Sequence, residues 1–597
     1  MAKRKINKKK SSKKRKLTDE EKAQRQQERE IRNLLKNIGF ERINRVNGKE
    51  FTFNERTSEL DDIFYFENII LLTEYTISKK VGEHLLKKIH FYNKVNENKT
   101  DFIKFLFDNN IYPDLNEKFE NNKFLKKYSL KQLQISILYC SKNTISQEHK
   151  NQATNVVYFD YHIVKYFESI AKVIKKSTKY EFFSFLNIPF NKVGEEILKS
   201  EDNSSKKFSG HILPEEHSSF KEGYKIVSFY IDAKNLLKRS YVLRQNDWRQ
   251  KDIIGHYQRM FIQSKIKSMR KYLHEKKRVF INNIIATIST DKIKLYDQNE
   301  NEIIIDKNGN FNTGETKVTP AKIEIVDETN IIGIIDGQHR TFAYHEGDDV
   351  YEETIKEFRN IQNLLVTGIL YPQKELKEKK LKFEANLFME INATQSGASS
   401  QLKQEIELMI NPFSSTSIAK KIIENLNKSG PLSNLLEEYW YEKGKLKTAS
   451  IVSFGLKPLI KIDDEKSKDS IFSIWNNENK NKLKEKNTEE YELLNEYIDF
   501  ATEKIRDIMI AFKDNLDSKK WKVDRNDSDA ILTVTTINGI FNALRKIIEN
   551  NQNTTFTIDE YKELLRDIDD FNFKQFKSSQ YRKMGEDLYQ KYLSNKS

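Results

Sequence analysis

Residues Ile331–Ala343 read IIGIIDGQHRTFA, and this stretch decides how the middle of the chain is built. A short apolar run is followed by a glycine turn and then by residues that suit a helix start, which predicts strand, turn and helix. Such a turn presents backbone N–H groups and a helix N-terminus, which favour an anion. Gly337 lets the backbone approach a phosphate closely. Arg340 adds a planar set of donors and His339 a titratable one, while Asp336 suits a metal or a turn cap.

The same residues carry a family resemblance. Asp336-Gly337-Gln338-His339-Arg340 is the signature of the DGQHR domain, so the chain resembles DndB-type proteins of DNA phosphorothioation systems and the wider ParB/sulfiredoxin-like group. Two further boxes occur in the expected order, Tyr257-Gln258-Arg259 at the start of a helix and FMEINATQ over Phe388–Gln395. The resemblance covers about residues 220–410. It implies a ParB/sulfiredoxin-like α/β domain, placed at residues 210–410, that binds a nucleoside triphosphate, ATP or GTP.

The resemblance also implies roles for single residues. Gly337 and Gln338 would contact phosphates through the backbone, and Arg340 would pair with the outer phosphate oxygens. Gln258 and Arg259 would close the pocket, and Asn392 and Gln395 would hold a metal or orient a water. Alternatives remain open, because Arg259 also suits a surface ion pair, Asn392 a helix cap and the whole turn a structural role. The implied nucleotide-binding set is Asp336, Gly337, Gln338, His339, Arg340, Gln258, Arg259, Asn392 and Gln395.

A second informative stretch, Glu59–Thr76, reads ELDDIFYFENIILLTEYT. Two apolar runs flank Glu67-Asn68, which predicts a β-hairpin. The hairpin would bring Asp61 and Glu74 side by side, and two carboxylates so placed suit Mg²⁺ and the activation of a water for phosphodiester cleavage. The alternative is a hairpin whose acids lie on solvated strand ends.

This hairpin resembles the PD-(D/E)xK nucleases. Glu59-Leu60-Asp61 matches the first acidic element of that superfamily and Glu74-Tyr75-Thr76 the second. Thr76 stands where the superfamily has its catalytic lysine, so Lys79 or Lys80 would have to replace it, or the domain would only bind DNA. Glu28 or Glu30, on a preceding helix, would add a third carboxylate. The expected catalytic set is Asp61, Glu74 and Lys79, with Asp61 and Glu74 as ligands of Mg²⁺.

Periodicity outside these motifs predicts the remaining elements. The N-terminal part, residues 21–198, reads as a restriction-endonuclease-like α/β domain, and residues 411–597 as a helical region. Residues 199–207 read as a linker. The predicted strands are Phe51–Phe53, Asp62–Phe66, Asn68–Thr73, Gln134–Cys140, Val156–Phe159, Lys225–Ile231, Phe280–Ile288, Ile331–Ile335 and Asn363–Ile369. The stretch Asp291–Thr319 reads as a loop or hairpin. The predicted helices are a helix opening at Thr18, Gly82–Val95, Asp101–Phe107, Tyr161–Ile174, Tyr257–His274, Gln401–Ile410, Ser417–Asn427, Leu432–Trp440, Glu489–Phe512, Thr535–Asn550, Ile558–Phe571 and Tyr581–Tyr592.

Charge is concentrated at the start of the chain. The net charge is +15, from 103 Lys and Arg against 88 Asp and Glu, and ten of the basic residues fall in the first 16 positions. We expect residues 1–20 to form a disordered basic tail that binds DNA phosphates without sequence preference, or one that only aids solubility. The basic residues are Lys3, Arg4, Lys5, Lys8, Lys9, Lys10, Lys13, Lys14, Arg15 and Lys16.

Composition excludes several classes. A single cysteine, Cys140, rules out an internal disulfide and Cys-cluster metal sites, and the histidines show no HExxH spacing. No GxxxxGK[ST] motif and no apolar run long enough to cross a membrane occurs. The basic start is not followed by the apolar stretch of a signal peptide, so a cytoplasmic location is expected.

Two functions fit the sequence best, and a purely structural scaffold is a third, lesser alternative. The first is a nucleotide-regulated DNA endonuclease of bacterial restriction, DNA modification or phage defence. The second is a non-catalytic DNA-binding regulator of a DNA-modification locus, with an inactive nuclease-like domain. DNA and a nucleoside triphosphate are partners in both, and a homo-oligomer is compatible with either.

Overall fold

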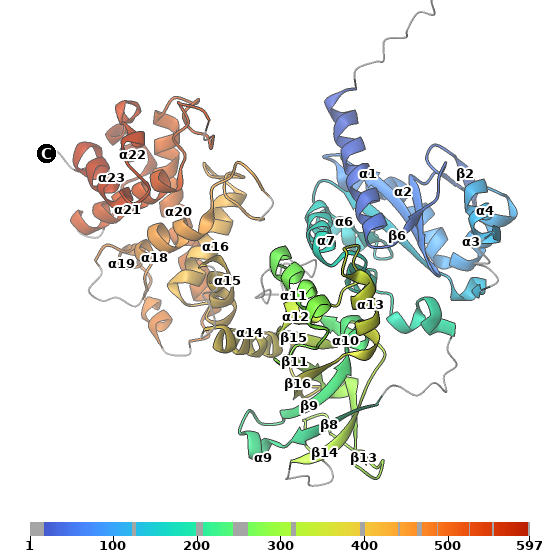
Figure 1. Ribbon diagram of the computed structural model, residues 1–597. Coiled ribbons are helices and arrows are strands. Elements are labelled where there is room, and N and C mark those ends of the chain that lie inside the picture. The colour runs from blue at the N-terminus through green and yellow to red at the C-terminus, as the bar shows by residue number, and fades with distance from the viewer. Residues whose placement is uncertain are drawn as a thin grey trace, which may run out of the picture. The chain divides into compact units, whose positions relative to one another are not determined.

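The chain is a mixed α/β protein with two compact units. The computed structural model describes residues 17–121, 127–198, 207–242, 261–311, 318–393, 400–439, 442–462, 468–485, 488–524, 526–551 and 554–594 (Figure 1). The first unit comprises Met1–Val242 and Met260–Lys374, and the second comprises Leu243–Arg259 and Glu375–Ser597. The expected nuclease-like domain and most of the expected DGQHR domain therefore lie in one unit. Residues 1–16 of the predicted tail lie outside the described residues, whereas Asp19 and Glu20, which were predicted to belong to the tail, form the first turn of α1.

The N-terminal part of the first unit begins with α1 (Asp19–Asn37). The capping box between Thr18 and Glu21 opens this helix, and Gly39, at φ 107°, follows its end, both as predicted. The other elements here are β1 (Glu41–Arg42), β2 (Phe51–Phe53), β3 (Arg56–Ser58), β4 (Asp62–Phe66), β5 (Ile69–Thr76), α2 (Val81–Glu97), α3 (Lys99–Asp108), α4 (Pro113–Asn121), β6 (Gln134–Ser141), α6 (Gln147–Gln152), β7 (Val157–Tyr158), α7 (Tyr161–Ile174) and α8 (Thr178–Phe185).

Five described strands form a mixed sheet in the order β1-β4-β5-β6-β7. The pairs β1–β4 and β4–β5 are antiparallel, whereas β5–β6 and β6–β7 are parallel. Alternate residues of the hairpin point to opposite faces. Ile63 and Leu72 join the core with α2, α3 and α4, while Asp62 and Tyr75 face α1 and Arg32. The hairpin predicted from Glu59–Thr76 is thus present, with a longer second strand.

The central part of the first unit is a larger curled sheet. Its described strands run in the order β10-β15-β11-β16-β9-β8-β14-β12-β13. They are β8 (Lys207–Leu213), β9 (Lys225–Asp232), β10 (Ser240–Tyr241), β11 (Ile284–Ser289), β12 (Ile293–Tyr296), β13 (Glu302–Ile303), β14 (Thr319–Ile325), β15 (Ile332–Asp336) and β16 (Asn363–Tyr371). The helices are α9 (Glu215–Ser218), α10 (Ala233–Arg239), α11 (Gln263–Lys276), α12 (Gln338–Phe342) and α13 (Glu352–Ile361), and Figure 1 shows α10 to α13 grouped at the β15 end of the sheet.

Several sequence predictions for this part are wrong in detail. The helix predicted from Tyr257 begins at Gln263, because Ile262 is extended and its N–H donates to His339 (3.2 Å). The strand predicted from Phe280 begins at Ile284. Strands β8 and β14 carry a polar outer face, so their weak hydrophobic signal was missed. Within the described part of residues 291–319, β12 and β13 pair antiparallel, which agrees with the predicted loop or hairpin.

The second unit is helical in its described residues. Its longest elements are α14 (Lys377–Ala393), α15 (Ser400–Ile410), α16 (Ser415–Lys428), α20 (Tyr491–Asn515), α21 (Val534–Asn550), α22 (Ile558–Leu564) and α23 (Tyr581–Leu588). One apolar core joins these from α16 onward. The helix predicted over Leu432–Trp440 is wrong: its described residues form turns, and Leu446 N donates to the carbonyl of Leu435.

Asp62 holds the hairpin against α1. Its carboxylate accepts hydrogen bonds from Arg32 Nε (2.6 Å), Arg42 Nε (2.5 Å) and the Tyr75 hydroxyl (2.9 Å), and the side chain is fully buried. An amide in place of this carboxylate keeps one accepting oxygen but turns the other into an N–H donor, so at least one of the three donors loses its acceptor and faces another donor.

Asp62→Asn should therefore weaken the local stability of β4 and β5 by about 2–4 kcal/mol. Asp61→Asn is the matched control and should cost less than about 1 kcal/mol, since Asp61 accepts one backbone N–H and a long contact from Asn47. Amide hydrogen exchange of Ile69–Thr76 measures both, because the four tryptophans lie outside residues 17–198. Equal losses for the two variants would contradict this assignment.

Candidate functional site

The β4–β5 hairpin brings together two of the predicted catalytic residues. Asp62 pairs with Thr73 in the antiparallel register, so Asp61 falls opposite Glu74 when the register is extended by one residue. Asp61 and Glu74 share the strand face of Ile63 and Leu72, which is the face covered by α2. The Tyr75 N–H donates to Asp61 Oδ2 (2.8 Å), which fixes that carboxylate at the strand end.

Helix α2 supplies a lysine that the sequence reasoning missed. Lys88 Nζ lies 2.6 Å from Glu74 Oε1, and the Lys88 side chain is about one-fifth exposed. His84 lies one turn earlier on α2, with its Nε2 3.9 Å from the same oxygen and its Nδ1 2.7 Å from the Tyr139 hydroxyl. Residues four apart share a helix face, so α2 presents both side chains to Glu74. Only the spacing of His84 and Lys88 on a predicted helix could have suggested this.

The two carboxyl groups lie in an environment that disfavours their charge. Burial, and then the negative charge of Asp61, raise the pKa of Glu74 to about 7, although Lys88 acts in the opposite direction. Burial also raises the pKa of Asp61, partly offset by the hydrogen bond from Tyr75. Burial and the nearby Lys88 lower the pKa of His84, so this imidazole is neutral at pH 7. Such shifts concentrate where ionisable groups serve chemistry or binding.

A polar cleft of about 600 Å³ opens at the β5–α2 connection; His84 lines it, whereas Asp61, Glu74 and Lys88 are not among its lining residues. It is lined by Tyr75, Thr76, Ile77, Ser78, Lys79 and His84 of the β5–α2 connection and by Glu20 and Gln24 of α1. Lys79 is exposed in this cleft, and among the described residues Lys88 is the lysine that contacts Glu74. Of the two candidate third carboxylates, Glu28 contributes to the raised pKa of Asp61, whereas Glu30 pairs with Lys165 (2.9 Å).

The carboxylate oxygens of Asp61 and Glu74 are suitable ligands for a hard cation such as Mg²⁺. Glu74 Oε2 is buried and has no hydrogen-bond partner, which is unfavourable unless a cation or a water completes it. Carboxylate oxygens are the ligands that Mg²⁺ prefers. No group of three or more His, Cys, Asp or Glu in the described part of the chain is arranged as a metal site, so protein ligands would come from Asp61 and Glu74 alone.

The DGQHR turn has the predicted strand–turn–helix form. Strand β15 ends at Asp336, Gly337 has φ 95°, and α12 follows over five residues. A side chain at position 337 would strain the backbone at this φ, and its Cβ would lie 2.5 Å from Ile284 Cδ1, so glycine is favoured in this turn. Arg340 Nη2 donates to Asp336 Oδ2 (2.8 Å) and to the Asn283 carbonyl (2.9 Å), while its buried Nε has no partner.

The other predicted nucleotide-binding residues are placed only in part. Gln338 is buried at the start of α12, and His339 Nε2 accepts the Ile262 N–H. Asn392 lies in the last turn of α14, in the second unit. Gln258, Arg259, Gln395 and the ten basic residues of the tail lie outside the described residues.

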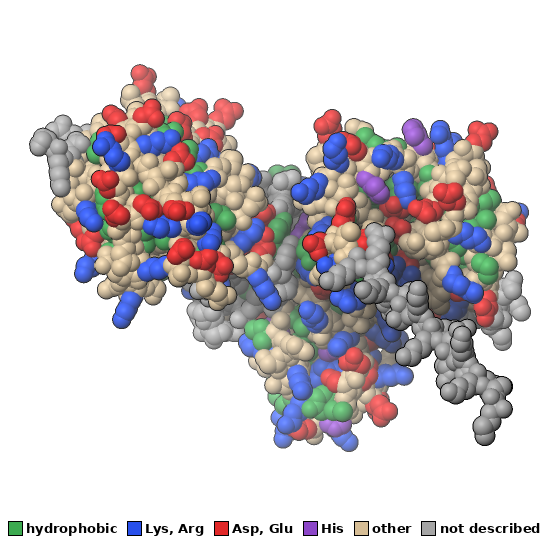
Figure 2. All heavy atoms as spheres, turned by 90° about the horizontal axis from the view of Figure 1, so that it is seen from above, with side chains coloured by type: hydrophobic (Ala, Val, Ile, Leu, Met, Phe, Trp, Pro, Cys, Tyr) green, Lys and Arg blue, Asp and Glu red, His purple; other side chains and the backbone are tan. Residues whose placement is uncertain are grey.

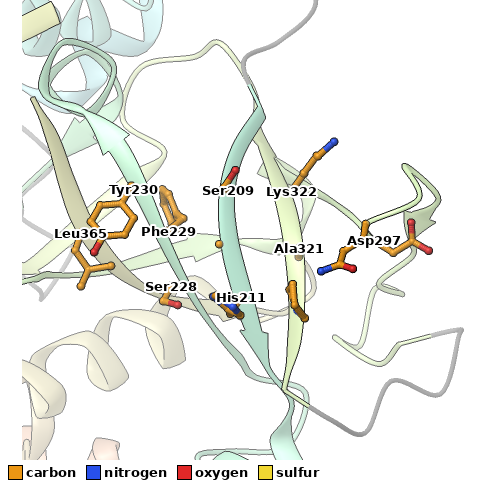
Figure 3. Close-up of a pocket in the computed structure, with 12 residues that line it drawn as sticks. Ser209, His211, Ser228, Phe229, Tyr230, Asp297, Ala321, Lys322 and Leu365 are labelled. Carbon is orange, nitrogen blue, oxygen red and sulfur yellow. The ribbon is translucent and has the colours of Figure 1, made fainter. Parts of the chain in front are cut away.

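A separate cavity of about 450 Å³ lies on the open face of the central sheet (Figure 3). Ser209 and His211 of β8, Tyr230 of β9 and Lys322 of β14 are among its lining residues, and Tyr230 is 58% exposed. None of the residues Asp336–Arg340 lines it. Lys322 pairs with Glu300, and Asp297 caps its own turn, so the charges at its rim are already matched.

The described residues on the surface shown in Figure 2 form no region of a single charge that would indicate a particular partner. On the face shown in Figure 2, Lys and Arg side chains are interspersed with Asp and Glu side chains. No helix within the described ranges is both long and apolar enough to span a bilayer.

The raised pKa of Glu74 generates a prediction for stability. Between its ordinary value of 4.5 and about 7, the folded protein keeps a proton that the unfolded chain has released, so the folded state loses stability as pH rises through this range. Glu74→Gln removes this penalty. The variant should be more stable than the parent at pH 8 by about 1–3 kcal/mol, with no difference near pH 4.5.

Hydrogen exchange of the β5 amides between pH 4.5 and 8.5, corrected for the intrinsic exchange rate, measures this difference. Glu83→Gln, an exposed change on α2, is the control and should behave as the parent at every pH. A stability difference for Glu74→Gln that does not vary with pH would exclude the raised pKa.

No family model, no curated protein and no solved structure matches this chain.

Proposed function

We propose that the chain is a Mg²⁺-dependent DNA endonuclease whose activity is regulated by a nucleoside triphosphate. The observation that carries the proposal is the convergence of Asp61, Glu74 and Lys88 next to His84, which lines a polar cleft. Asp61 and Glu74 lie at one end of a hairpin, and Lys88 lies on the neighbouring helix α2. This arrangement, in a mixed sheet flanked by α1 and α2, also supports the resemblance to PD-(D/E)xK nucleases. The lysine would come from α2 in place of the residue missing at Thr76.

The residues have separable roles in this proposal. Asp61 and Glu74 would hold Mg²⁺, which when bound supplies a Lewis acid and lowers the pKa of a coordinated water. Lys88 keeps Glu74 oriented in the absence of substrate and offers a positive charge to a scissile phosphate. His84, held through Nδ1 by Tyr139, keeps a neutral ring at the cleft wall. The Tyr75 N–H holds the Asp61 carboxylate at the end of its strand.

The DGQHR turn is proposed as the nucleotide site. The positive φ of Gly337, which a side chain would strain, and the unpartnered Arg340 Nε support a phosphate at this turn. Arg340 is held by Asp336 in the structure, so a bound phosphate would compete with that carboxylate for the guanidinium. Gln258, Arg259, Asn392 and Gln395 are proposed as the remainder of the pocket on the family resemblance alone.

One observation favours the alternative function, a non-catalytic DNA-binding regulator of a DNA-modification locus. Thr76 is buried at the position of the superfamily lysine. Lys88, which would replace that lysine, is already paired with Glu74. DNA is the partner in either case, with the basic residues of positions 3–16 as the phosphate-binding segment. The reduced Cys140 thiol is compatible with the cytoplasm of a bacterium.

The nuclease proposal predicts a defined set of inactive variants. Asp61→Asn, Glu74→Gln and Lys88→Met should each lower Mg²⁺-dependent cleavage of supercoiled plasmid by at least about 100-fold, because each removes a group at the reacting phosphate. Fluorescence anisotropy with a labelled duplex should show unchanged DNA binding. Lys87→Met, at the exposed neighbour of Lys88, and Lys79→Met should both keep activity.

Loss of cleavage in Lys79→Met, with activity retained in Lys88→Met, would return the catalytic role to Lys79. Cleavage that survives both Asp61→Asn and Glu74→Gln would remove the nuclease assignment from this hairpin. A parent protein that binds DNA but never cleaves it would leave the regulator as the function.

The nucleotide proposal predicts a graded effect at Arg340. A bidentate charged contact contributes about 2–3 kcal/mol, so Arg340→Ala should weaken Mg²⁺–ATP or Mg²⁺–GTP binding by roughly 30- to 150-fold. Arg340→Lys should recover part of the loss, since a point charge cannot replace the planar donors. Calorimetric titration measures all three proteins, with the exposed Arg278→Ala as control. Equal binding by parent and Arg340→Ala would show that the turn is only structural.

A further inference from the structure

The segment that follows α12 is held by two buried arginines. Arg270 of α11 donates through Nη1 to the carbonyls of Ala343 (3.0 Å) and His345 (2.8 Å). Arg359 of α13 donates to the carbonyls of Tyr344 (2.6 Å) and His345 (2.9 Å). Residues 343–345 are therefore tied to α11 and α13 through every carbonyl group they present.

Two carboxylates balance these arginines. Arg270 bonds Asp349 (2.8 Å) and Glu352 (2.9 Å), and Arg359 bonds Glu352 (2.7 Å). Burial, and then the charge of Arg270, lower the pKa of His345 to about 3, so His345 is neutral and adds no charge to the cluster. The arrangement is a rigid, charge-matched clamp on the C-terminal end of the helix that begins at the DGQHR turn.

Glu346, the next residue, connects this clamp to the N-terminal part of the same unit. Its carboxylate accepts from Lys179 Nζ (2.7 Å) and the Tyr180 hydroxyl (3.1 Å), and its N–H donates to Ser177 Oγ (2.8 Å). Burial raises the pKa of Glu346, but Lys179, Arg359 and the Tyr180 hydroxyl together outweigh it and keep the pKa below its ordinary value. One ionised side chain thus joins α12 to the start of α8.

Lys179 continues the connection to the β4–β5 hairpin. Its Nζ lies 5.5 Å from the centre of the Phe66 ring, and Phe66 packs against Phe183 of α8 at 5.6 Å. Phe66 is the last residue of β4, and Asp61 precedes the first. The turn end of the hairpin therefore rests on α8, while its other end carries the acidic pair.

We infer that Glu346 is the coupling residue through which a nucleoside triphosphate at the DGQHR turn changes the position of the catalytic hairpin. The inference rests on the proposed function, which supplies the nucleotide site and the catalytic hairpin, and it adds the link between these two sites. A ligand that pulls Arg340 from Asp336 displaces α12, the arginine clamp transmits the displacement to Glu346, and Lys179 and Phe66 carry it to the turn of the hairpin. The nucleotide site and the hairpin are coupled through the same contact, so a ligand bound at the hairpin should change the affinity for nucleotide by the same factor.

Amide hydrogen exchange of the full chain tests this without nucleotide. We call the contact between Glu346 and Lys179 the junction. Glu346→Gln should raise exchange at least about tenfold across α8, and Lys179→Met should raise exchange across residues 338–346, on the other side of the junction. The double variant should add little to either single change, because both remove one link. Glu353→Gln and Lys176→Met, matched changes at exposed neighbours, should leave both segments as in the parent.

The same measurement with Mg²⁺–ATP or Mg²⁺–GTP tests the coupling itself. In the parent, nucleotide should slow exchange in α12 and change it in α8 and β4. In Glu346→Gln the α12 response should remain while the α8 and β4 responses disappear, and nucleotide should no longer change the rate of plasmid cleavage.

The outcomes separate the two proposals. A parent whose α12 does not respond to nucleotide overturns the nucleotide site, and the nucleotide-free experiment then decides the junction alone. Exchange across residues 338–346 that is unchanged by Lys179→Met overturns the junction. So does an α8 response to nucleotide that survives in both Glu346→Gln and Lys179→Met.

Discussion

The antiparallel pairing of β4 and β5 is the constraint on which the candidate site depends. Because side chains alternate along a strand, one register sends Asp62 and Tyr75 to the α1 face and Asp61 and Glu74 to the α2 face. A shift of one residue would exchange the two sets and place Asp62 beside Lys88. The buried contacts of Asp62 with Arg32 and Arg42 oppose that shift, so a structural carboxylate secures the position of its functional neighbour.

Two carboxylates of the same hairpin, Asp62 and Glu74, differ in their environments. Asp62 is fully buried with three donors and holds the hairpin in place. Glu74 is almost as buried, yet one of its oxygens has no partner and its pKa is raised by burial and by Asp61. A folded chain tolerates such a group only when the rest of the unit is stable enough to hold it. An uncompensated buried carboxylate oxygen is therefore better evidence for a ligand than an acidic motif alone.

The sequence predicted the hairpin, the order of elements around it and the DGQHR turn, because each rests on local signals. The capping box at Thr18, the two apolar runs around Glu67-Asn68 and the Asp336-Gly337 turn are all read within a few residues. Strands β8 and β14 were missed since their outer faces are polar, and the start of α11 was misplaced because Ile262 bonds to His339, 77 residues away. Lys88 could not be assigned from sequence either, as only the packing of α2 on the sheet brings it to Glu74.

A lysine supplied by a helix makes the site a product of two elements and not of one strand. In a site built on β5 alone, Glu74 and a lysine at position 76 would keep a fixed separation whatever the hairpin did. Here the separation of Lys88 and Glu74 depends on how α2 lies against the sheet. Gly82 lets the start of α2 lie close to α6, since a Cβ there would lie 2.4 Å from the His149 ring of α6. Small movements of the hairpin against α2 would then open or close the contact between Lys88 and Glu74. The turn of the hairpin rests on α8, and Glu346 joins α8 to the segment after α12, so the acidic pair and the proposed nucleotide site are linked through the same helix.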